Sequence, residues 1–255
     1  MSGVRVERDG ALVTLALDRP RRRNALTGEM YEALEAALAE AEGDDAVRVV
    51  LFRGTDDTFT AGNDLEDFLQ RPPSGRDSPV FRFLERAAFA TKPLVAAVNG
   101  PAIGLGTTLL LHCDLVYAGE GARFQMPFVK LGLVPEFAST YLLPLAAGHA
   151  RSRELLLLGE PFDAPTAQAA GLVTAVVPDG ETHARAAQAA SRLASLPPES
   201  VRETKRLLRE PHRAGIEQAL HAESQVFRAM LARPEAREAL AAFLARRASP
   251  AGGGG

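Results

Sequence analysis

Several things are scarce in this sequence, and each scarcity excludes a class of protein. The 255 residues contain no Trp and a single Cys, so an internal disulfide cannot form. No stretch approaches the roughly 18 uncharged apolar residues that a membrane-spanning helix needs. The first nine residues also lack the apolar centre of a secretory signal. These absences predict a cytoplasmic protein with no membrane partner.

A strong charge of one sign is also missing. The formal net charge is -3, from 29 basic and 32 acidic residues, without a long run of either sign. This balance argues against a nucleic-acid partner. Hydrophobic residues make up 46% of the chain, which is ordinary for a globular protein and sufficient for one large α/β domain with a sizeable core.

Apolar runs alternate with helical patterns over the first two thirds of the chain. Strands are predicted at residues 11–17, 47–52, 94–98, 115–117 and 172–177. Helices are predicted from Thr27, which is a plausible N-cap, and at residues 80–90, 107–111, 135–147, 151–158 and 164–170. Strands that alternate with helices imply βαβ units and a mainly parallel sheet.

The character of the chain changes after Pro178. Residues 181–247 are rich in Ala, Arg and Leu and contain no strand-like run, which predicts a helical C-terminal layer. We therefore expect an α/β core at residues 1–178, a helical oligomerisation region at 179–248, and a disordered Gly-rich tail at 249–255.

Two turns of small residues each follow a predicted buried strand. The first is residues 61–65 (AGNDL), in which Asp64 suits the start of a following helix, and the second is residues 99–106 (NGPAIGLG). Small residues allow a ligand to approach the backbone closely, and N–H groups at the start of a helix suit developing negative charge. A phosphate-binding loop is a poor alternative, because the chain has neither G-x-G-x-x-G here nor a Walker lysine.

With three further segments, these turns resemble the crotonase (enoyl-CoA hydratase/isomerase) superfamily from about Ala11 to Phe243. Residues 19–26 resemble its first CoA-contacting segment, and residues 127–135 and 164–177 complete the family's order. The resemblance implies an α/β fold: a crotonase-type spiral of ββα and βαβ turns with a C-terminal helical layer. It also implies an acyl-CoA thioester substrate, a homotrimer or dimer of trimers, and no cofactor or metal.

The resemblance assigns roles to individual residues. The thioester carbonyl would accept hydrogen bonds from the backbone N–H groups of Ala61 and Leu105, which would stabilise the enolate formed during the reaction. Two residues of the last predicted helix would reach the CoA moiety. The implied substrate-binding residues are Arg23, Ala25, Leu26, Gly62, Asn63, Asp64, Leu65, Gly104, Phe128, Phe243 and Arg246.

The acids of the acyl pocket distinguish the members of the superfamily. Hydratases use two glutamates, and their positions here hold Thr108 and Phe128, neither of which is a general base near neutral pH. One nearby acid, Glu136, follows Pro135 and should lie in the first turn of a helix. It is either a helix-capping surface residue or a catalytic group whose pKa is raised by apolar surroundings. Asp114, the other acid near the second turn, is predicted to form structural hydrogen bonds.

Peroxisomal-type enoyl-CoA delta isomerases resemble this pattern most closely. They are similar at both turns, lack the hydratase glutamates, and carry a Glu directly after the proline at position 135. The implied enzyme shifts the double bond of a 3-enoyl-CoA to the 2-position, with Glu136 as its only acid and base. The alternatives are a hydratase, another single-acid reaction such as ring-opening isomerisation in aromatic-acid breakdown, and a non-catalytic acyl-CoA-binding protein.

Overall fold

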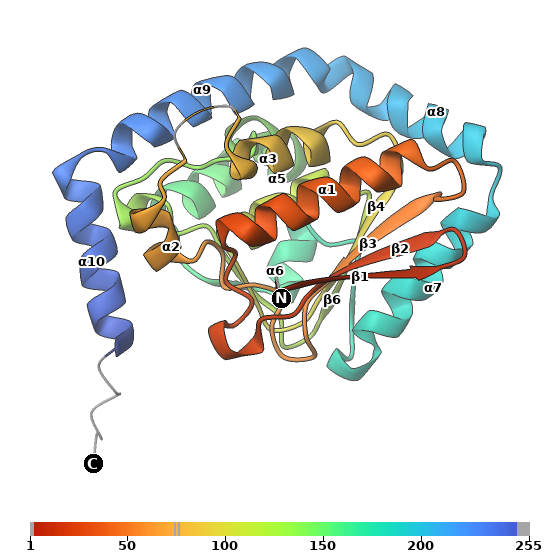
Figure 1. Cartoon of the computed structure of the whole chain (residues 1–255), viewed down its shortest axis with the longest axis horizontal. Helices are drawn as coiled ribbons and strands as arrows, with labels where there is room; N and C mark the ends of the chain where they lie inside the picture. Colours follow the sequence, from red (N-terminus) through yellow and green to blue (C-terminus); the bar gives the residue numbers. More distant parts are fainter. Residues whose placement is uncertain (1–2, 74, 76, 249–255) are drawn as a thin grey trace.

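The computed structural model describes residues 3–73, 75 and 77–248, apart from the side chains of 246–248. Its fold is mixed α/β with a helical C-terminal region (Figure 1). The main sheet has six strands in the order β1-β2-β3-β4-β6-β9, parallel except for the β1–β2 pair. These strands are β1 Val4–Asp9, β2 Leu12–Leu17, β3 Val49–Arg53, β4 Leu94–Val98, β6 Leu115–Gly119 and β9 Ala175–Val177.

The central strands of this sheet are buried on both faces. In β3, Val50 and Phe52 join the main core, whereas Val49 and Leu51 pack in a second cluster on the opposite face. Such a strand reads as a continuous apolar run, because both sets of alternate side chains are covered. Helices α1 and α3 belong to the main core, and α7 covers the opposite face. Their bounds are α1 Gly28–Gly43, α3 Pro79–Ala88 and α7 Thr182–Ser195.

A smaller sheet and several short elements connect the layers. Its strands are β5 Pro101–Ile103, β7 Arg123–Gln125 and β8 Phe162–Asp163, in the order β5-β7-β8. Helix α5 is bent at Gly148, whose φ of 74° and ψ of 163° are not helical. The other helices of this part are α2 Leu65–Gln70, α4 Leu105–Thr108, α5 Ser139–Leu158 and α6 Ala164–Ala169, with 3-10 helices η1 Pro20–Arg22, η2 Leu109–His112 and η3 Val129–Leu131.

The chain after β9 is helical throughout its described part, as the sequence predicts. In Figure 1, α8 and α9 run along the top of the molecule and α10 descends at one side. Among the described residues no helix is long and apolar enough to cross a membrane. The predicted tail at 249–255 lies outside the described residues. The remaining elements are η4 Asp179–Glu181, α8 Pro198–Arg209, η5 Glu210–His212, α9 Arg213–Leu231 and α10 Pro234–Ala248.

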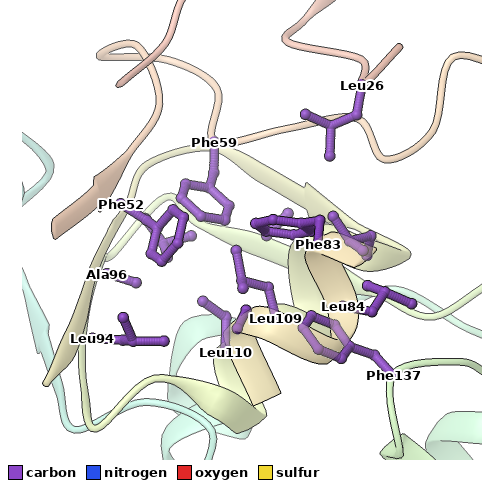
Figure 2. Close-up of a cluster of buried hydrophobic side chains, with 14 of the residues drawn as sticks. Leu26, Phe52, Phe59, Phe83, Leu84, Leu94, Ala96, Leu109, Leu110 and Phe137 are labelled. Carbon is purple, nitrogen blue, oxygen red and sulfur yellow. The ribbon is translucent and has the colours of Figure 1, made fainter. Parts of the chain in front are cut away.

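A cluster of large side chains fills the space between the sheet and α3 (Figure 2). Phe83 of α3 is fully buried, and its ring centroid lies 5.7 Å from that of Tyr31 and 6.4 Å from those of Phe52 and Phe137. Phe137 directly follows the candidate catalytic acid Glu136 in the chain. The core therefore anchors the residue next to that acid.

Candidate active site

The two turns of small residues lie side by side. The Thr60 N–H donates to the Pro101 carbonyl at 2.9 Å, and the Ile103 N–H donates to the Thr60 carbonyl at 3.0 Å. Gly62 has a φ of 82°, and a Cβ atom there would stand 2.7 Å from the Ile103 carbonyl oxygen. Only glycine allows both this backbone conformation and this close approach. The turns follow the adjacent parallel strands β3 and β4, so they meet at one edge of the sheet.

The N–H groups that the turns leave available differ from the predicted pair. The Ala61 N–H donates to the Arg23 carbonyl at 2.9 Å. The prediction that Ala61 supplies a donor to the substrate is therefore wrong. A parallel bridge joins Leu26 and Asn63: the Leu26 N–H donates to the Gly62 carbonyl, and the Asp64 N–H donates to the Leu26 carbonyl. The backbone groups on either side of the Asn63 N–H are therefore bonded. Among the described residues, the N–H groups of Asn63 in the first turn and Leu105 in the second donate to no acceptor, so one N–H of each turn is available.

Asp64 stabilises the first turn through its carboxylate. One oxygen accepts from the N–H groups of Glu66 and Asp67 at 3.1 and 3.3 Å, which caps α2. The other accepts from the Arg19 guanidinium at 2.6 Å. Burial alone would raise the pKa of Asp64, but the hydrogen bonds from Arg19 and from the Asp67 N–H outweigh burial and lower it. The predicted helix start is confirmed. Protein donors reach both oxygens, so Asp64 shapes the turn, and its predicted contact with the substrate stays a prediction.

Tyr31 is a component of this turn that the sequence does not reveal. Its side chain is only 1% exposed, and its hydroxyl donates a hydrogen bond to the Asn63 side-chain oxygen. Burial raises the pKa of Tyr31 well above its usual value, and the nearby charge of Glu136 raises it further. In the sequence, Tyr31 is one more apolar-face residue of α1, so nothing distinguishes it from a core residue.

The second turn depends on Gly104. Its φ of 56° and ψ of -117° suit glycine, and it is followed directly by Leu105, the first residue of α4. The Leu105 side chain is buried in the main core. Two ring carbons of Phe128 lie 4.0 Å from where a Gly104 Cβ would stand. Phe128 therefore borders the second turn, and its contact with the substrate stays a prediction.

Glu136 does not lie in the first turn of a helix, so that prediction is wrong. Helix α5 begins only at Ser139, because Phe137 and Ala138 adopt left-handed conformations with φ of 63° and 55°. Such conformations cost non-glycine residues about 1–2 kcal/mol each, so other contacts must hold this turn. The Glu136 side chain points inward: the residue is 6% exposed, and its carboxylate accepts a hydrogen bond from the Thr108 hydroxyl at 2.5 Å.

Burial raises the pKa of Glu136 to about 8. The Thr108 hydroxyl opposes this rise by hydrogen bonding, and the neighbouring charge of Glu223 adds to it. A buried carboxyl group with a pKa near neutrality suits proton transfer, and the surface-capping alternative does not fit its burial. Thr108 lies three residues after Leu105 in the same short helix, so both lie on one side of that helix. The carboxylate is therefore close to the second turn.

A pocket of about 380 Å³ adjoins Glu136 between α3 and α9. Its lining combines apolar and charged side chains. Across the described ranges, no group of three or more His, Cys, Asp or Glu side chains is arranged to hold a metal ion. The pocket is lined by Phe81, Leu84, Glu85, Phe89, Glu136, Phe137, Arg213, Glu217, Leu220, His221, Glu223 and Ser224.

The segment predicted to contact CoA lies beside the first turn. Leu26 is buried and its N–H donates to the Gly62 carbonyl at 2.8 Å, while Ala25 is also buried and Arg23 is exposed. Leu65 is the first residue of α2, and α10 packs against α2. Phe243 is half-buried on α10. The side chain of Arg246 lies outside the described residues.

A family model described as enoyl-CoA hydratase/isomerase matches residues 7–252. The chain belongs to the enoyl-CoA hydratase/isomerase family. The predicted crotonase-type fold is confirmed by an enoyl-CoA hydratase/isomerase structure from Pseudoalteromonas atlantica T6c, which has a TM-score of 0.91 and 44% identity over 97% of this chain and 99% of that one. The OdaA structure from Pseudomonas aeruginosa has a TM-score of 0.93 and 50% identity over 96% of this chain and 99% of that one.

Two curated relatives of the chain carry different names. Enoyl-CoA delta isomerase 2 of Rattus norvegicus is 35% identical over 251 residues, which are 96% of this chain but only 64% of the rat protein. The 2,3-dehydroadipyl-CoA hydratase of Escherichia coli K12 is 35% identical over 249 residues, which are 97% of both chains. Family membership therefore leaves the reaction to be decided from the site.

Proposed function

We propose that this protein is an enoyl-CoA isomerase that moves the double bond of a 3-enoyl-CoA to the 2-position. The observation that carries the proposal is the buried carboxyl group of Glu136, with a pKa of about 8 and a hydrogen bond from Thr108. The other buried carboxylate of this pocket, Glu223, is bonded to the backbone of Ala138 and Thr140. Two available N–H groups, of Asn63 and Leu105, stand in adjoining turns.

In the proposed reaction, the thioester oxygen accepts hydrogen bonds from the Asn63 and Leu105 N–H groups. The Glu136 carboxylate removes a proton from carbon 2, and the electron pair moves toward the thioester oxygen as an enolate. Each well-aimed donor stabilises this developing charge by about 3–4 kcal/mol. Glu136 then returns the proton to carbon 4 as the double bond forms between carbons 2 and 3. One acid–base group is sufficient, because no atoms are gained or lost.

Hydration is the second candidate, favoured by the relationship to the Escherichia coli hydratase. The resemblance to the superfamily implies that a hydratase would use two glutamates. Thr108 and Phe128 stand at those two positions here. Thr108 instead donates a hydrogen bond to Glu136 through its hydroxyl, and Phe128 borders the second turn. One carboxyl group would have to hold the water and also deliver the proton, so we expect hydration to be negligible.

Two substrates distinguish the candidates. The purified protein is incubated separately with 3-hexenoyl-CoA and with crotonyl-CoA, and the products are separated by chromatography and identified by mass. We expect conversion of 3-hexenoyl-CoA to the isomeric 2-hexenoyl-CoA with no change in mass, and no hydration of crotonyl-CoA. Rapid addition of water to crotonyl-CoA, without isomerisation of 3-hexenoyl-CoA, would refute the proposal.

A further inference from the structure

The left-handed turn before α5 is held by a buried side chain from α9. One oxygen of the Glu223 carboxylate accepts the Ala138 N–H at 2.6 Å. The other accepts the Thr140 N–H at 2.9 Å and the Thr140 hydroxyl at 2.5 Å. Glu223 is 6% exposed and lies 83 residues from Thr140 in the chain. A carboxylate at the start of a helix also interacts favourably with the helix dipole.

The position of Glu223 on its helix is unusual for an acid. The buried residues of α9 are Ile216, Glu223, Phe227 and Leu231, so the carboxylate occupies the apolar face of an amphipathic helix. Buried carboxylates are retained when they are fully hydrogen-bonded, as this one is. Helix α5 has no side-chain cap of its own, because its N-cap residue is Ala138. Glu223 supplies the missing cap from a distant part of the sequence.

The opposite side of the same turn is held by His112. Its Nε2–H donates to the Phe137 carbonyl at 2.7 Å, and its ring stacks on the Phe137 ring with centroids 4.0 Å apart. Burial lowers the pKa of His112 to about 3, so the ring is neutral over the working pH range. The neutral His112 ring therefore holds the Phe137 carbonyl, and the Glu223 carboxylate holds the Ala138 N–H.

We propose that Glu223 is a positioning residue, whose carboxylate holds the left-handed turn that aims Glu136 into the site. This inference rests on the proposed function, because aiming Glu136 affects turnover only if Glu136 transfers the proton. Glu223 also acts through its charge, which raises the pKa of Glu136. The other titratable or charged groups around this pair are Glu85 on α3, Arg213, Glu217 and His221 on α9, His112 on η2 and Tyr31 on α1.

The test is Glu223→Gln, which keeps the volume but turns one acceptor oxygen into an amide group that faces an N–H donor. We expect kcat for 3-hexenoyl-CoA to fall by about 10- to 100-fold, since small misplacements of a catalytic group have effects of this size. KM should change by less than about threefold, because the Glu223 carboxylate bonds to Ala138 and Thr140 and Gln keeps its volume at the pocket wall. The rising limb of the pH–rate profile should move to lower pH, because the negative charge beside Glu136 is lost.

The matched control is Glu203→Gln on the neighbouring helix α8. Glu203 is exposed, does not line the pocket beside Glu136, and its carboxylate pairs with the Arg206 guanidinium at 2.9 Å. This variant should retain the kcat and the pH profile of the unmodified protein. A Glu223→Gln protein with unchanged kcat and pH profile would overturn the proposal. So would one that loses activity through KM alone, since that result indicates a cap without influence on Glu136.

Two further measurements separate this proposal from the proposed function. If the unmodified protein does not isomerise 3-enoyl-CoA, a carbon-13 NMR titration of the Glu136 carboxyl group still reports the influence of Glu223. Its midpoint should be lower in Glu223→Gln, with faster amide hydrogen exchange at Ala138 and Thr140, and no change in either would overturn the positioning role.

If Glu223→Gln does not fold, Thr140→Val removes one of the three hydrogen bonds and should lower kcat by about two- to fivefold. An unchanged kcat would count against the proposal.

Discussion

Replacing Glu136 by Gln should stabilise the protein, and the gain should grow with pH. Burial raises the pKa of Glu136 to about 8 in the folded chain, against about 4.5 when it is exposed to water. Because the folded pKa is the higher one, the stability associated with this group is complete below pH 4.5 and is lost as pH rises to about 8. At about 1.4 kcal/mol per pH unit, the full loss is at most about 5 kcal/mol.

Glutamine resembles the protonated carboxyl group and does not titrate. Its side-chain oxygen can still accept the hydrogen bond from the Thr108 hydroxyl. The free energy of unfolding of Glu136→Gln should therefore exceed that of the unmodified protein by a margin that increases by about 3 kcal/mol between pH 5.5 and pH 8. Urea unfolding at several pH values measures this margin. The pH-dependent contribution of Glu223 to the free energy of unfolding largely cancels, because Glu223 is present in both proteins. A margin that does not change with pH would refute the assignment of a buried carboxyl group with a raised pKa.

Two other predictions concern catalysis. In the unmodified protein, kcat/KM for 3-hexenoyl-CoA should rise with pH around a midpoint near 8, because only the ionised Glu136 removes a proton. Stopped-flow rates from pH 6 to 9.5 measure this rise, and a flat profile would contradict it. Leu105→Pro should lower kcat by about 100- to 1,000-fold, because proline has no N–H and the first position of a helix otherwise accepts it. Leu105→Ala keeps the N–H, so its loss of kcat should be much smaller, and circular dichroism confirms that both variants are folded. A fully active Leu105→Pro protein would exclude this N–H as a donor.

Much of the fold could be predicted because its local patterns are strong. The apolar run at residues 94–98 predicts a strand, and β4 spans Leu94–Val98. The run is recognisable because every side chain of β4 is buried. The N-cap at Thr27 was expected and its side chain accepts the Met30 N–H. Strand β1 was missed, because it is an exposed edge strand whose pairing with β2 is a tertiary contact. Asp114 was expected to form structural hydrogen bonds, and it accepts from the Leu94 N–H and the Lys205 ammonium group.

The chemistry of the site was less accessible from the sequence. The small residues of both turns predicted that the backbone is exposed there, but the sequence could not show that the Arg23 carbonyl occupies the Ala61 N–H. Pro135 suggested a helix start, yet the turn at Phe137 is held left-handed by partners from distant elements. The one available signal was Glu223, an acid on the apolar face of α9, where a charge needs a buried partner.

The most direct test of the proposed reaction is the turnover of Glu136→Gln with 3-hexenoyl-CoA. Gln cannot take up the proton from carbon 2, but it leaves the N–H groups of Asn63 and Leu105 in place. We expect kcat to fall by at least about 100-fold, because positioned acid–base groups contribute about 100- to 10,000-fold. Binding of the CoA ester, measured by calorimetry, should change little. Unimpaired turnover by a folded Glu136→Gln protein would contradict the central role assigned to this residue.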